Sequence, residues 1–498
     1  MMRIESFKEL VDSFQGNNDP AFSSFENETN ITYNDLYNQI YVYADKLHEI
    51  STGDKVVLFD VPNIEWVCIY FAVILNRGII VPVDTRVSKD FLLNVIENIK
   101  PKIIVSDSLK LDSVTIVRTK EILLRKNILE KTEILSNDIN KVSEVLFTSG
   151  TWGIPKGVML SQKNILTNAY QILDMYHHKK EDTSLSILPM SHAYQQTAGL
   201  IIPLIVGSHV VFLEKPDSFK IIEAIKKYKI KTILVVPKVL DLIKSSILRK
   251  IYNKNIRSVV RKTIIHSSSL PIFIRKILFK FIRNQIGVSL KNFIVGGALL
   301  SKETDDFFRG LGYKLCIGYG LTETSPVISL SIDQKRKEGN VGQIVKGLEY
   351  SKNENGELVV SGDNVFLGYY PDYNNKVFNT GDVIDFDKNN NLILKGRTKN
   401  LIIWPTGDKI FAEDLEYIIS RVTNTEEVCI VHSLKQDTPV IYCAIKSEQT
   451  ITIDLEHLHS KLPNNIKIEK VTLFSSNDFP YTHTLKPNRQ KILELFTK

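Results

Sequence analysis

The feature that most constrains the fold of this chain is an alternation of short apolar runs with longer amphipathic segments. The runs Val56–Phe59, Ile79–Val81 and Ile103–Val105 are continuously apolar, as expected for strands buried on both faces. Further along, Ile165–Met175 and Ile221–Tyr228 carry apolar residues at helical spacing. Strands that alternate with helices in this way predict an α/β protein built mostly on parallel sheets.

The same pattern continues to about Val345 and then changes. The runs Thr232–Val236 and Phe293–Val295 predict further buried strands, whereas Gly356–Val360 and Asn391–Leu394 are bounded by turn residues, as antiparallel strands are. A shorter α+β unit is expected from residue 400 onward. Its expected elements are helices at Ala412–Arg421 and Glu456–Leu462 and strands at Val428–Val431, Val440–Ile445 and Val471–Phe474.

Length and cysteine content narrow the class of protein. A chain of 498 residues buries a sizeable core without disulfide bonds or metal ions. The four cysteines, Cys68, Cys316, Cys429 and Cys443, are far apart in the sequence, so neither a disulfide framework nor a paired metal-ligand motif is expected. The first residues lack the apolar core of a signal peptide, and the longest uncharged apolar stretch, Thr197–Leu213, is shorter than the ~20 residues of a membrane-spanning helix. We therefore expect a cytoplasmic protein.

The net charge of +7, from 63 basic and 56 acidic residues, is concentrated in one segment. Residues 242–301 contain twelve Lys or Arg and no Asp or Glu, interleaved with apolar residues such as Ile277–Phe279. Such a segment suits an anionic membrane surface, which would make the protein peripherally membrane-associated, an acidic carrier protein, or a substrate that bears several phosphates. A solvated helical face is the plainer alternative. No recognition motif accompanies the charge, which argues against nucleic acid.

The sharpest local motif is the glycine-rich segment Thr148–Gly157, which lies between the apolar runs Val145–Phe147 and Val158–Leu160. Its glycines let backbone N–H groups approach an anion, its hydroxyls donate hydrogen bonds, and Lys156 supplies positive charge. The segment is not a Walker A loop, because Pro155 directly precedes the lysine. It predicts a polyphosphate site, with a simple glycine-rich turn as the alternative.

This segment resembles the phosphate loop of the AMP-forming acyl-adenylating superfamily, which includes acyl-CoA synthetases, peptide-synthetase adenylation domains and firefly-type luciferases. The resemblance continues, motif by motif, from about Thr32 to the C-terminus. One departure is Trp152, which occupies a place where the family has a small hydroxyl residue. The phosphate-binding residues that the resemblance implies are Thr148, Ser149, Gly150, Thr151, Gly153 and Lys156.

Two further segments resemble the nucleotide-binding motifs of that superfamily. Gly296–Ala298 follows an expected strand, as the family's adenine-contacting turn does, and Gly318–Thr324 resembles its most recognisable segment. The resemblance implies that Tyr319 stacks on adenine, that Thr322 approaches the phosphate, and that Glu323 binds Mg²⁺. An aromatic face suits a base and a carboxylate suits a hard cation. The implied adenine contacts are Gly297, Ala298, Tyr319 and Gly320.

The remaining motifs are carried by the last quarter of the chain. Thr380–Asp382 resembles the ribose-binding motif, and Gly396–Asn400 resembles the junction between domains, with Arg397 near ribose and phosphate and Lys399 at the hinge. Pro480–Arg489 resembles the segment that delivers the adenylating lysine, here Lys486, although Leu485 replaces the family's glycine. The ribose contact is Asp382. The resemblance predicts an adenylate-forming domain over residues 1–397, with a small β-barrel-like part, and a mobile α+β lid domain over residues 398–498.

A histidine-containing segment, Leu188–Gly199, resembles the acyl-site turn of fatty acyl-CoA and acyl–carrier-protein synthetases. It predicts that His192 and Tyr194 border the acyl site and that the apolar run Leu200–Val206 lines it. The alternatives are that His192 is a structural histidine in a turn and that the apolar run is a buried strand or helix without such a role. Asp241 is the nearest acid to the place where amino-acid-activating relatives have an aspartate, and it is expected on a helix, outside a pocket turn. We therefore expect an apolar acid of medium to long chain.

Together these motifs predict an AMP-forming fatty acid–CoA ligase that uses ATP, Mg²⁺ and coenzyme A. Two alternatives remain open at this point. In the first, the acyl acceptor is the phosphopantetheine of a carrier protein instead of coenzyme A. In the second, the chain is a degenerate homologue that binds nucleotide without activity, as Trp152 and Leu485 would suggest. No feature of the sequence points specifically to a luciferase-type oxygenase.

Overall fold

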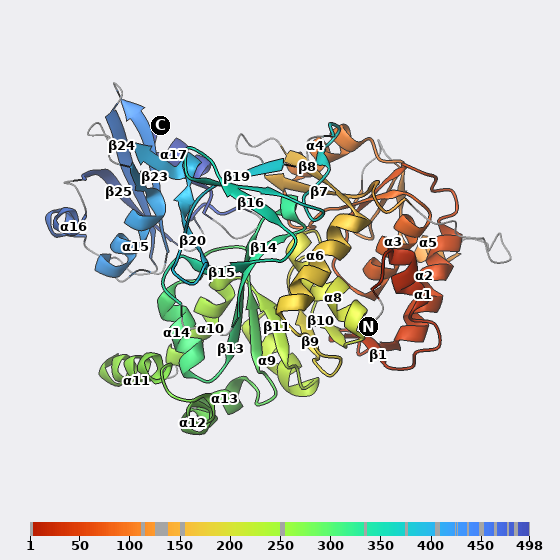
Figure 1. Cartoon of the computed structure of the whole chain (residues 1–498), viewed down its shortest axis with the longest axis horizontal. Helices are drawn as coiled ribbons and strands as arrows, with labels where there is room; N and C mark the ends of the chain where they lie inside the picture. Colours follow the sequence, from red (N-terminus) through yellow and green to blue (C-terminus); the bar gives the residue numbers. More distant parts are fainter. Residues whose placement is uncertain are drawn as a thin grey trace. The chain divides into compact units, whose positions relative to one another are not determined.

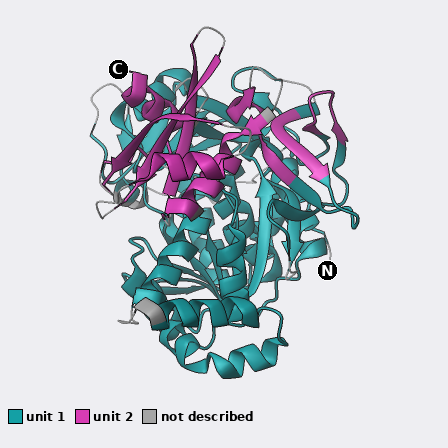
Figure 2. Cartoon of the chain, turned by 90° about the vertical axis from the view of Figure 1, so that its left-hand side faces the viewer, with its two compact units in different colours: residues 1–350, 360–378, 386–393 teal, residues 351–359, 379–385, 394–498 magenta. Residues whose placement is uncertain are grey.

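The computed structural model describes most of the chain, and its contacts divide it into two units. The described residues are 3–110, 115–124, 138–149, 155–249, 254–332, 336–373, 377–403, 409–423, 425, 427–435, 438–447, 453–462, 466–475, 478–482 and 487–497. Unit 1 comprises residues 1–350, 360–378 and 386–393, and unit 2 comprises residues 351–359, 379–385 and 394–498. Figure 2 colours the two units separately. The predicted domain boundary at residues 397 and 398 stays a prediction.

Unit 1 contains two sheets. In the larger one the strand order from β15 onward is β15-β14-β13-β12-β11-β9-β10-β1-β2. The six strands from β13 to β1 run parallel to one another, whereas β14 and β2 pair antiparallel with β13 and β1 (Figure 1). The strands are β1 (Pro20–Ser24), β2 (Asn30–Thr32), β9 (Ser184–Ser186), β10 (Val210–Phe212), β11 (Thr232–Val235), β12 (Asn292–Val295), β13 (Lys314–Gly320), β14 (Val327–Ile332) and β15 (Asn340–Ile344).

The second sheet of unit 1 has the order β18-β8-β7-β4-β3-β5-β6. Its strands are β3 (Lys55–Leu58), β4 (Ile79–Pro82), β5 (Ile103–Val105), β6 (Ile116–Val117), β7 (Val142–Ser149), β8 (Pro155–Ser161) and β18 (Gly368–Tyr369). Strands β3 to β7 pair in parallel, whereas β8 returns antiparallel to β7 and pairs with β18. The predicted α/β fold is confirmed, but its sheets are mixed, because β8, β14 and β15 are joined to their neighbours by antiparallel pairing.

The helices of unit 1 flank these sheets. Asn63 caps α3 by accepting a hydrogen bond from the Trp66 N–H, and α3 is buried along its whole length, as its apolar sequence predicts. The helices are α1 (Phe7–Asp12), α2 (Tyr33–Lys46), α3 (Ile64–Leu75), α4 (Lys89–Ile99), α5 (Thr119–Leu124), α6 (Gln162–Met175), α7 (Ala193–Gln196), α8 (Ile202–Val206), α9 (Ser218–Lys227), α10 (Pro237–Arg249), α11 (Lys254–Ser267), α12 (Ile272–Leu278), α13 (Lys280–Ile286) and α14 (Lys302–Gly310).

One core of unit 1 is aromatic and lies between the larger sheet and α14. Phe293 of β12 packs edge-on against Phe308 of α14 and against Tyr313, with ring centroids 5.1 and 5.2 Å apart. These rings are fully buried, and the burial of such side chains is the main favourable contribution to folding here.

Unit 2 contains the predicted α+β unit. Its three-stranded sheet pairs β23 (Glu427–Lys435) antiparallel with β24 (Thr438–Lys446), and β24 parallel with β25 (Ile468–Phe474). Helix α16 (Leu455–Lys461) makes the crossover that a parallel pair requires. Unit 2 also contains β21 (Leu401–Ile403), β22 (Lys409–Phe411), α15 (Ala412–Thr423) and α17 (Arg489–Thr497). Four strands contribute residues to both units: β16 (Glu349–Lys352), β17 (Glu357–Ser361), β19 (Val377–Phe386) and β20 (Leu392–Arg397).

The four cysteines are all buried, and none forms a disulfide bond. Burial raises the pKa of each thiol, to about 12 for Cys316 and Cys429. No helix within the described ranges is long and apolar enough to cross a membrane.

Candidate functional site

The glycine-rich segment is the tip of the β7–β8 hairpin. Thr148 at the end of β7 lies opposite Lys156 in β8, so the hydroxyl and the lysine predicted to bind phosphate occupy facing positions. Lys156 is exposed. Four of the predicted phosphate contacts are not placed, because Gly150, Thr151 and Gly153 and the side chain of Ser149 lie outside the described residues.

The predicted metal ligand Glu323 is held close to this hairpin by a tyrosine. The hydroxyl of Tyr369 donates a hydrogen bond of 2.7 Å to the Glu323 Oε1 atom, and the Lys156 Nζ atom lies 5.2 Å from the centre of the Tyr369 ring. Burial and the Glu323 charge raise the pKa of Tyr369, which keeps its hydroxyl protonated as a donor. The segments predicted to bind the metal and the phosphates therefore meet at Tyr369 in unit 1.

A tight turn holds Glu323 in place. A Cβ atom on Gly320 would lie 1.8 Å from the carbonyl oxygen of Pro326, so only glycine fits there. Thr322 begins the 3₁₀ turn Thr322–Thr324, and the Thr324 hydroxyl donates to the Pro326 carbonyl at 2.6 Å. These contacts fix the backbone that carries Thr322 and Glu323.

The predicted adenine turn directly follows β12, which pairs in parallel with β13. Val295 pairs with Ile317, so Gly297 and Ala298 follow β12 at the edge of the sheet where Tyr319 lies in β13. Ligands of open parallel sheets commonly bind at the carboxyl ends of the strands. Tyr319 and Gly320 are half-buried.

Tyr194, predicted to border the acyl site, packs against this turn. Its hydroxyl donates to the Ile294 carbonyl at 2.9 Å, and its ring lies 3.2 Å from the position that a Cβ atom on Gly296 would occupy. Glycine at position 296 therefore leaves room for the tyrosine ring. The structure thus brings the predicted acyl and adenine segments together.

His192 precedes α7 and is half-buried. Its charge acts on Asp84, which follows β4: burial raises the pKa of Asp84, but hydrogen bonds from Arg86 and the charges of Arg86 and His192 hold it below its usual value. Arg86 and Asp84 form an ion pair of 2.7 Å. The predicted acyl-site histidine therefore lies in a charged environment at the end of β4.

The apolar run after His192 is helical. Residues 197–201 form a π-helical turn that continues into α8, and its apolar side chains are buried. The Thr197 hydroxyl donates to the Ser325 carbonyl at 3.0 Å, which ties this helix to the turn that carries Glu323. Asp241 lies on α10, as predicted, where it accepts a hydrogen bond of 2.5 Å from the Thr304 hydroxyl.

A buried carboxyl group that the sequence does not single out connects β7 with α7. Glu144 is fully buried, and its Oε1 atom accepts a hydrogen bond of 2.5 Å from Gln196, which also donates to the Met190 carbonyl at 2.7 Å. Tyr70 donates to the Glu144 Oε2 atom at 3.3 Å. Burial raises the pKa of Glu144 to about 8, despite these hydrogen bonds.

In unit 2, Asp382 and Arg397 form one ion pair. The Arg397 Nε atom lies 2.7 Å from Asp382 Oδ1, and the Asp382 carboxylate is almost fully buried whereas the arginine is partly exposed. The Asp382 N–H donates to the Thr380 hydroxyl oxygen at 3.1 Å. The two residues predicted to bind ribose are therefore held together by their own contact.

Glu357 anchors the segments around this pair. Its carboxylate accepts hydrogen bonds from Thr398 at 2.5 Å and from Asn379 and Asn353 at 2.7 Å each. These hydrogen bonds lower the pKa of Glu357. The neighbouring Lys399, the predicted hinge residue, is exposed in the turn that follows β20.

The predicted adenylating residue Lys486 lies outside the described residues, but the ends of its segment are described. The Asn488 N–H donates to the Pro480 carbonyl at 2.9 Å, and Tyr481 forms a β-bridge with Pro487. Arg489 pairs with Glu416 at 2.7 Å and with Glu413 at 3.4 Å. The base of the Lys486 segment is therefore anchored to α15.

Two of the residues in these contacts escape sequence reasoning. Tyr369 follows a glycine in Gly368–Pro371, which reads as an ordinary turn, and Glu144 is one acid in an otherwise apolar strand. An acid at a position that should be buried is a signal for a paired or protonated group, but it does not name the partner.

A family model for "AMP-binding enzyme" matches residues 12–370. Among similar proteins, 4-coumarate–CoA ligase 2 of Solanum tuberosum is 24% identical over 65% of this chain and 61% of its own length. The long-chain-fatty-acid–CoA ligase ACSBG2 of Rattus norvegicus is 27% identical over 58% of this chain and 48% of its own length. The 2-succinylbenzoate–CoA ligase of Staphylococcus epidermidis is 25% identical over 94% of this chain and 93% of its own length.

Solved structures share the fold. The O-succinylbenzoate coenzyme A synthetase (MenE) of Bacillus subtilis, in complex with ATP and magnesium ion, superposes with a TM-score of 0.79 at 18% identity and covers 97% of this chain and 99% of its own. ATP-bound MatB from Rhodopseudomonas palustris gives a TM-score of 0.82 at 21% identity, covering 100% and 99%. The match with the coumarate ligase of Solanum tuberosum, by contrast, spans about six tenths of that protein's length.

Proposed function

Since this chain belongs to the AMP-binding enzyme family, we propose that it activates a carboxylic acid with ATP and transfers the acyl group to a thiol, that of coenzyme A. The acid is a fatty acid of medium to long chain. The observation that carries the proposal is the arrangement of Lys156, Tyr369 and Glu323, because the hairpin predicted to bind phosphate then lies beside a carboxylate suited to a metal.

An Mg²⁺ ion fits the surroundings of Glu323. That residue offers one carboxylate, and the described part of the chain holds no group of three or more His, Cys, Asp or Glu that would enclose a metal. Mg²⁺ commonly binds one or two carboxylates and completes its octahedron with phosphate oxygens and water. When bound, it would neutralise charge on the phosphates of ATP.

In the first half-reaction, an oxygen of the acid's carboxylate forms a bond to the α-phosphorus of ATP. The bond to pyrophosphate breaks, and pyrophosphate leaves with its electron pair. Thr148, Lys156 and Lys486 offset the developing negative charge, while Asp382 and Arg397 bind the ribose. Because the carboxylate is already a nucleophile, these residues contribute mainly positioning and electrostatic stabilisation.

In the second half-reaction, the thiol sulfur forms a bond to the acyl carbon. The acyl C–O bond breaks, AMP leaves with the electron pair, and the thiol proton passes to solvent. We propose that the residues after Lys399 move between the two half-reactions, as a gating step.

The apolar run Leu200–Val206 after His192, which is buried up to Ile205, supports a fatty acid as substrate. An aromatic acid is the second candidate, favoured by the names of the coumarate and succinylbenzoate ligases that the chain resembles. A carrier-protein thiol is the alternative acceptor, and an inactive nucleotide-binding homologue is the alternative of another class.

Pyrophosphate exchange into ATP tests the first half-reaction without any thiol. We expect exchange with fatty acids above that with aromatic or amino acids, and a loss of at least about 100-fold in Lys486→Ala. Lys491→Ala, an exposed lysine in α17, is the matched control and should exchange as the unmodified protein does. Exchange with aromatic acids alone would move the substrate to that class. A folded protein that binds ATP but shows exchange with no acid would support the alternative that the chain is an inactive nucleotide-binding homologue. A comparison of the acylation of coenzyme A with the acylation of a carrier protein then identifies the acceptor.

A further inference from the structure

The basic segment of unit 1 carries a row of apolar side chains that no part of the described structure covers. Phe273 and Ile277, four residues apart in α12, are 63% and 71% exposed, and Phe281, at the start of the next helix α13, is 77% exposed. Residues at this spacing share one face of a helix. Leu278, 59% exposed, widens the row. Large apolar side chains exposed together in this way mark an interaction surface.

Positive charge surrounds the row. Lys262, Lys276 and Lys280 are exposed beside it. Burial and the charges of Arg283, Lys314, Lys291 and Arg275 lower the pKa of Lys276, which places several cations close together. The acidic residues Asp241 and Glu303 form ion pairs with other residues: Lys244 pairs with both of them, and Arg261 pairs with Glu303. The charge around the row is therefore not neutralised by those acids.

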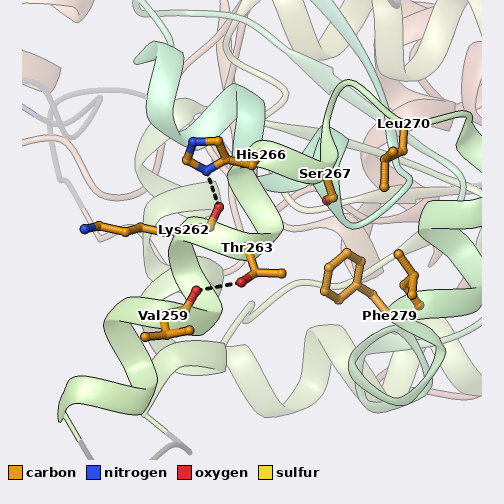
Figure 3. A pocket seen from close by; sticks show the side chains of 8 residues that line it. Val259, Lys262, Thr263, His266, Ser267, Leu270 and Phe279 are labelled. Atoms are coloured by element: carbon orange, nitrogen blue, oxygen red, sulfur yellow. Dashed lines mark hydrogen bonds between the residues drawn. The ribbon is translucent and has the colours of Figure 1, made fainter.

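An open apolar hollow of about 500 Å³ continues this surface from α12 to α11 (Figure 3). Val259, Leu270, Leu278 and Phe279 are among its lining residues. Its polar side chains are satisfied within α11: the Thr263 hydroxyl donates to the Val259 carbonyl at 2.9 Å, and His266 Nδ1 is bonded to the Lys262 carbonyl at 2.7 Å. The hollow thus presents hydrocarbon to a partner and few free polar groups.

We propose that this surface, formed by Val259, Lys262, Phe273, Lys276, Ile277, Leu278, Lys280 and Phe281 and called here the α11–α13 face, docks on an anionic lipid bilayer. Aromatic and aliphatic side chains enter the boundary between headgroups and acyl chains, and the lysines contact the anionic headgroups. Figure 1 shows α11, α12 and α13 together at one end of unit 1. An acidic carrier protein would use the charge, but it would leave the Phe273–Phe281 row without a matching hydrocarbon layer.

Vesicle co-sedimentation tests the proposal, with no substrate present, so its outcome is independent of the proposed reaction. The unmodified chain should bind vesicles of phosphatidylglycerol and phosphatidylcholine in equal parts, bind pure phosphatidylcholine at least about tenfold more weakly, and lose affinity as salt is raised. Phe273→Ser/Ile277→Ser/Phe281→Ser should weaken binding about 100-fold. Because the three side chains are exposed, the variant should keep its circular dichroism spectrum and melting temperature.

Matched control variants distinguish vesicle binding by the α11–α13 face from non-specific binding. Tyr373→Ser/Val377→Ser removes side chains that are 69% and 60% exposed elsewhere in unit 1 and should bind as the unmodified chain does. Lys262→Glu/Lys276→Glu/Lys280→Glu should lose at least about tenfold, whereas Lys89→Glu/Lys388→Glu should not. Equal binding to both vesicle types, unchanged binding by the triple variants, or binding of an acidic carrier protein in place of vesicles would overturn the proposal.

Discussion

The hydroxyl of Tyr369 donates a hydrogen bond of 2.7 Å to the carboxylate of Glu323. The two residues are 46 positions apart in sequence, and the Phe366 N–H, which donates to the Glu323 carbonyl at 2.8 Å, holds their segments together. Tyr369 itself lies in β18, which pairs with β8, the strand that carries Lys156. One tyrosine therefore links the orientation of the predicted metal ligand to the hairpin predicted to bind phosphate.

Tyr369→Phe should weaken the binding of Mg²⁺ in the first half-reaction without changing the fold. A hydrogen bond to a charged group contributes about 1.5–3 kcal/mol, so we expect about a tenfold rise in the Mg²⁺ concentration that gives half-maximal pyrophosphate exchange. Glu323→Gln should have a larger effect. Unchanged Mg²⁺ dependence in Tyr369→Phe would show that Glu323 is oriented without this contact.

Glu144 predicts a stability that falls as pH rises. Its pKa is about 8 in the folded chain, above the usual value of 4.5 for an unfolded glutamate. The folded state therefore binds the proton more tightly, and the stability that this supplies is complete below pH 4.5 and lost as pH rises toward 8. Glu144→Gln, which stays neutral, should melt higher than the unmodified chain at pH 8.5, and the difference should shrink toward pH 5. Differential scanning fluorimetry across this range measures it, and equal melting curves at pH 8.5 would refute it.

Asp305 predicts a large loss of stability on substitution. The carboxylate pairs with Arg309 at 2.8 Å and with Arg336 at 3.0 Å, and all three side chains are buried. Asp305→Ala removes the buried carboxylate that both arginines share, which should lower the free energy of unfolding by about 3–5 kcal/mol. Asp363→Ala, which removes an exposed partner of Lys163, should cost no more than about 1 kcal/mol. Urea unfolding of the two variants makes the comparison.

Arg489 predicts an effect on the first half-reaction through the base of the Lys486 segment. Its guanidinium joins Pro480–Arg489 to Glu416 and Glu413 of α15. Arg489→Ala should lower kcat for pyrophosphate exchange about tenfold or more, with a smaller change in KM for ATP, because the ATP-binding residues remain. Arg489→Lys should restore part of kcat, since it keeps one charge but not the paired geometry. A loss of the same size in KM alone would contradict a positioning role.

Most of the fold follows from local pattern. The runs at Ile103–Val105 and Phe293–Val295 are buried strands, and the α+β unit after residue 400 has the predicted helices and strands. The antiparallel return of β8 was not predicted, because an apolar run indicates burial but not strand direction.

The site is predictable where a motif is contiguous and not where it depends on distant pairing. Tyr319 and Glu323 belong to one short segment, so their proximity is fixed by the chain. Tyr369 and Gln196 contribute through contacts between elements far apart in sequence. The composition of residues 242–301 predicted a basic, apolar segment, but only the exposure of Phe273 and Phe281 distinguishes a docking face from a packed one.

Because its native cysteines are buried, this chain suits selective labelling with fluorescent dyes at introduced surface cysteines. Cys68, Cys316, Cys429 and Cys443 are shielded from solvent, and their raised pKa values suppress the reactive thiolate at neutral pH. Two cysteines introduced on the surface, one in each unit, would then react with maleimide dyes far faster than the native thiols. Single-molecule energy transfer then requires no native cysteine to be removed, and a change in the separation of the dyes during turnover would test the proposed movement of the residues after Lys399.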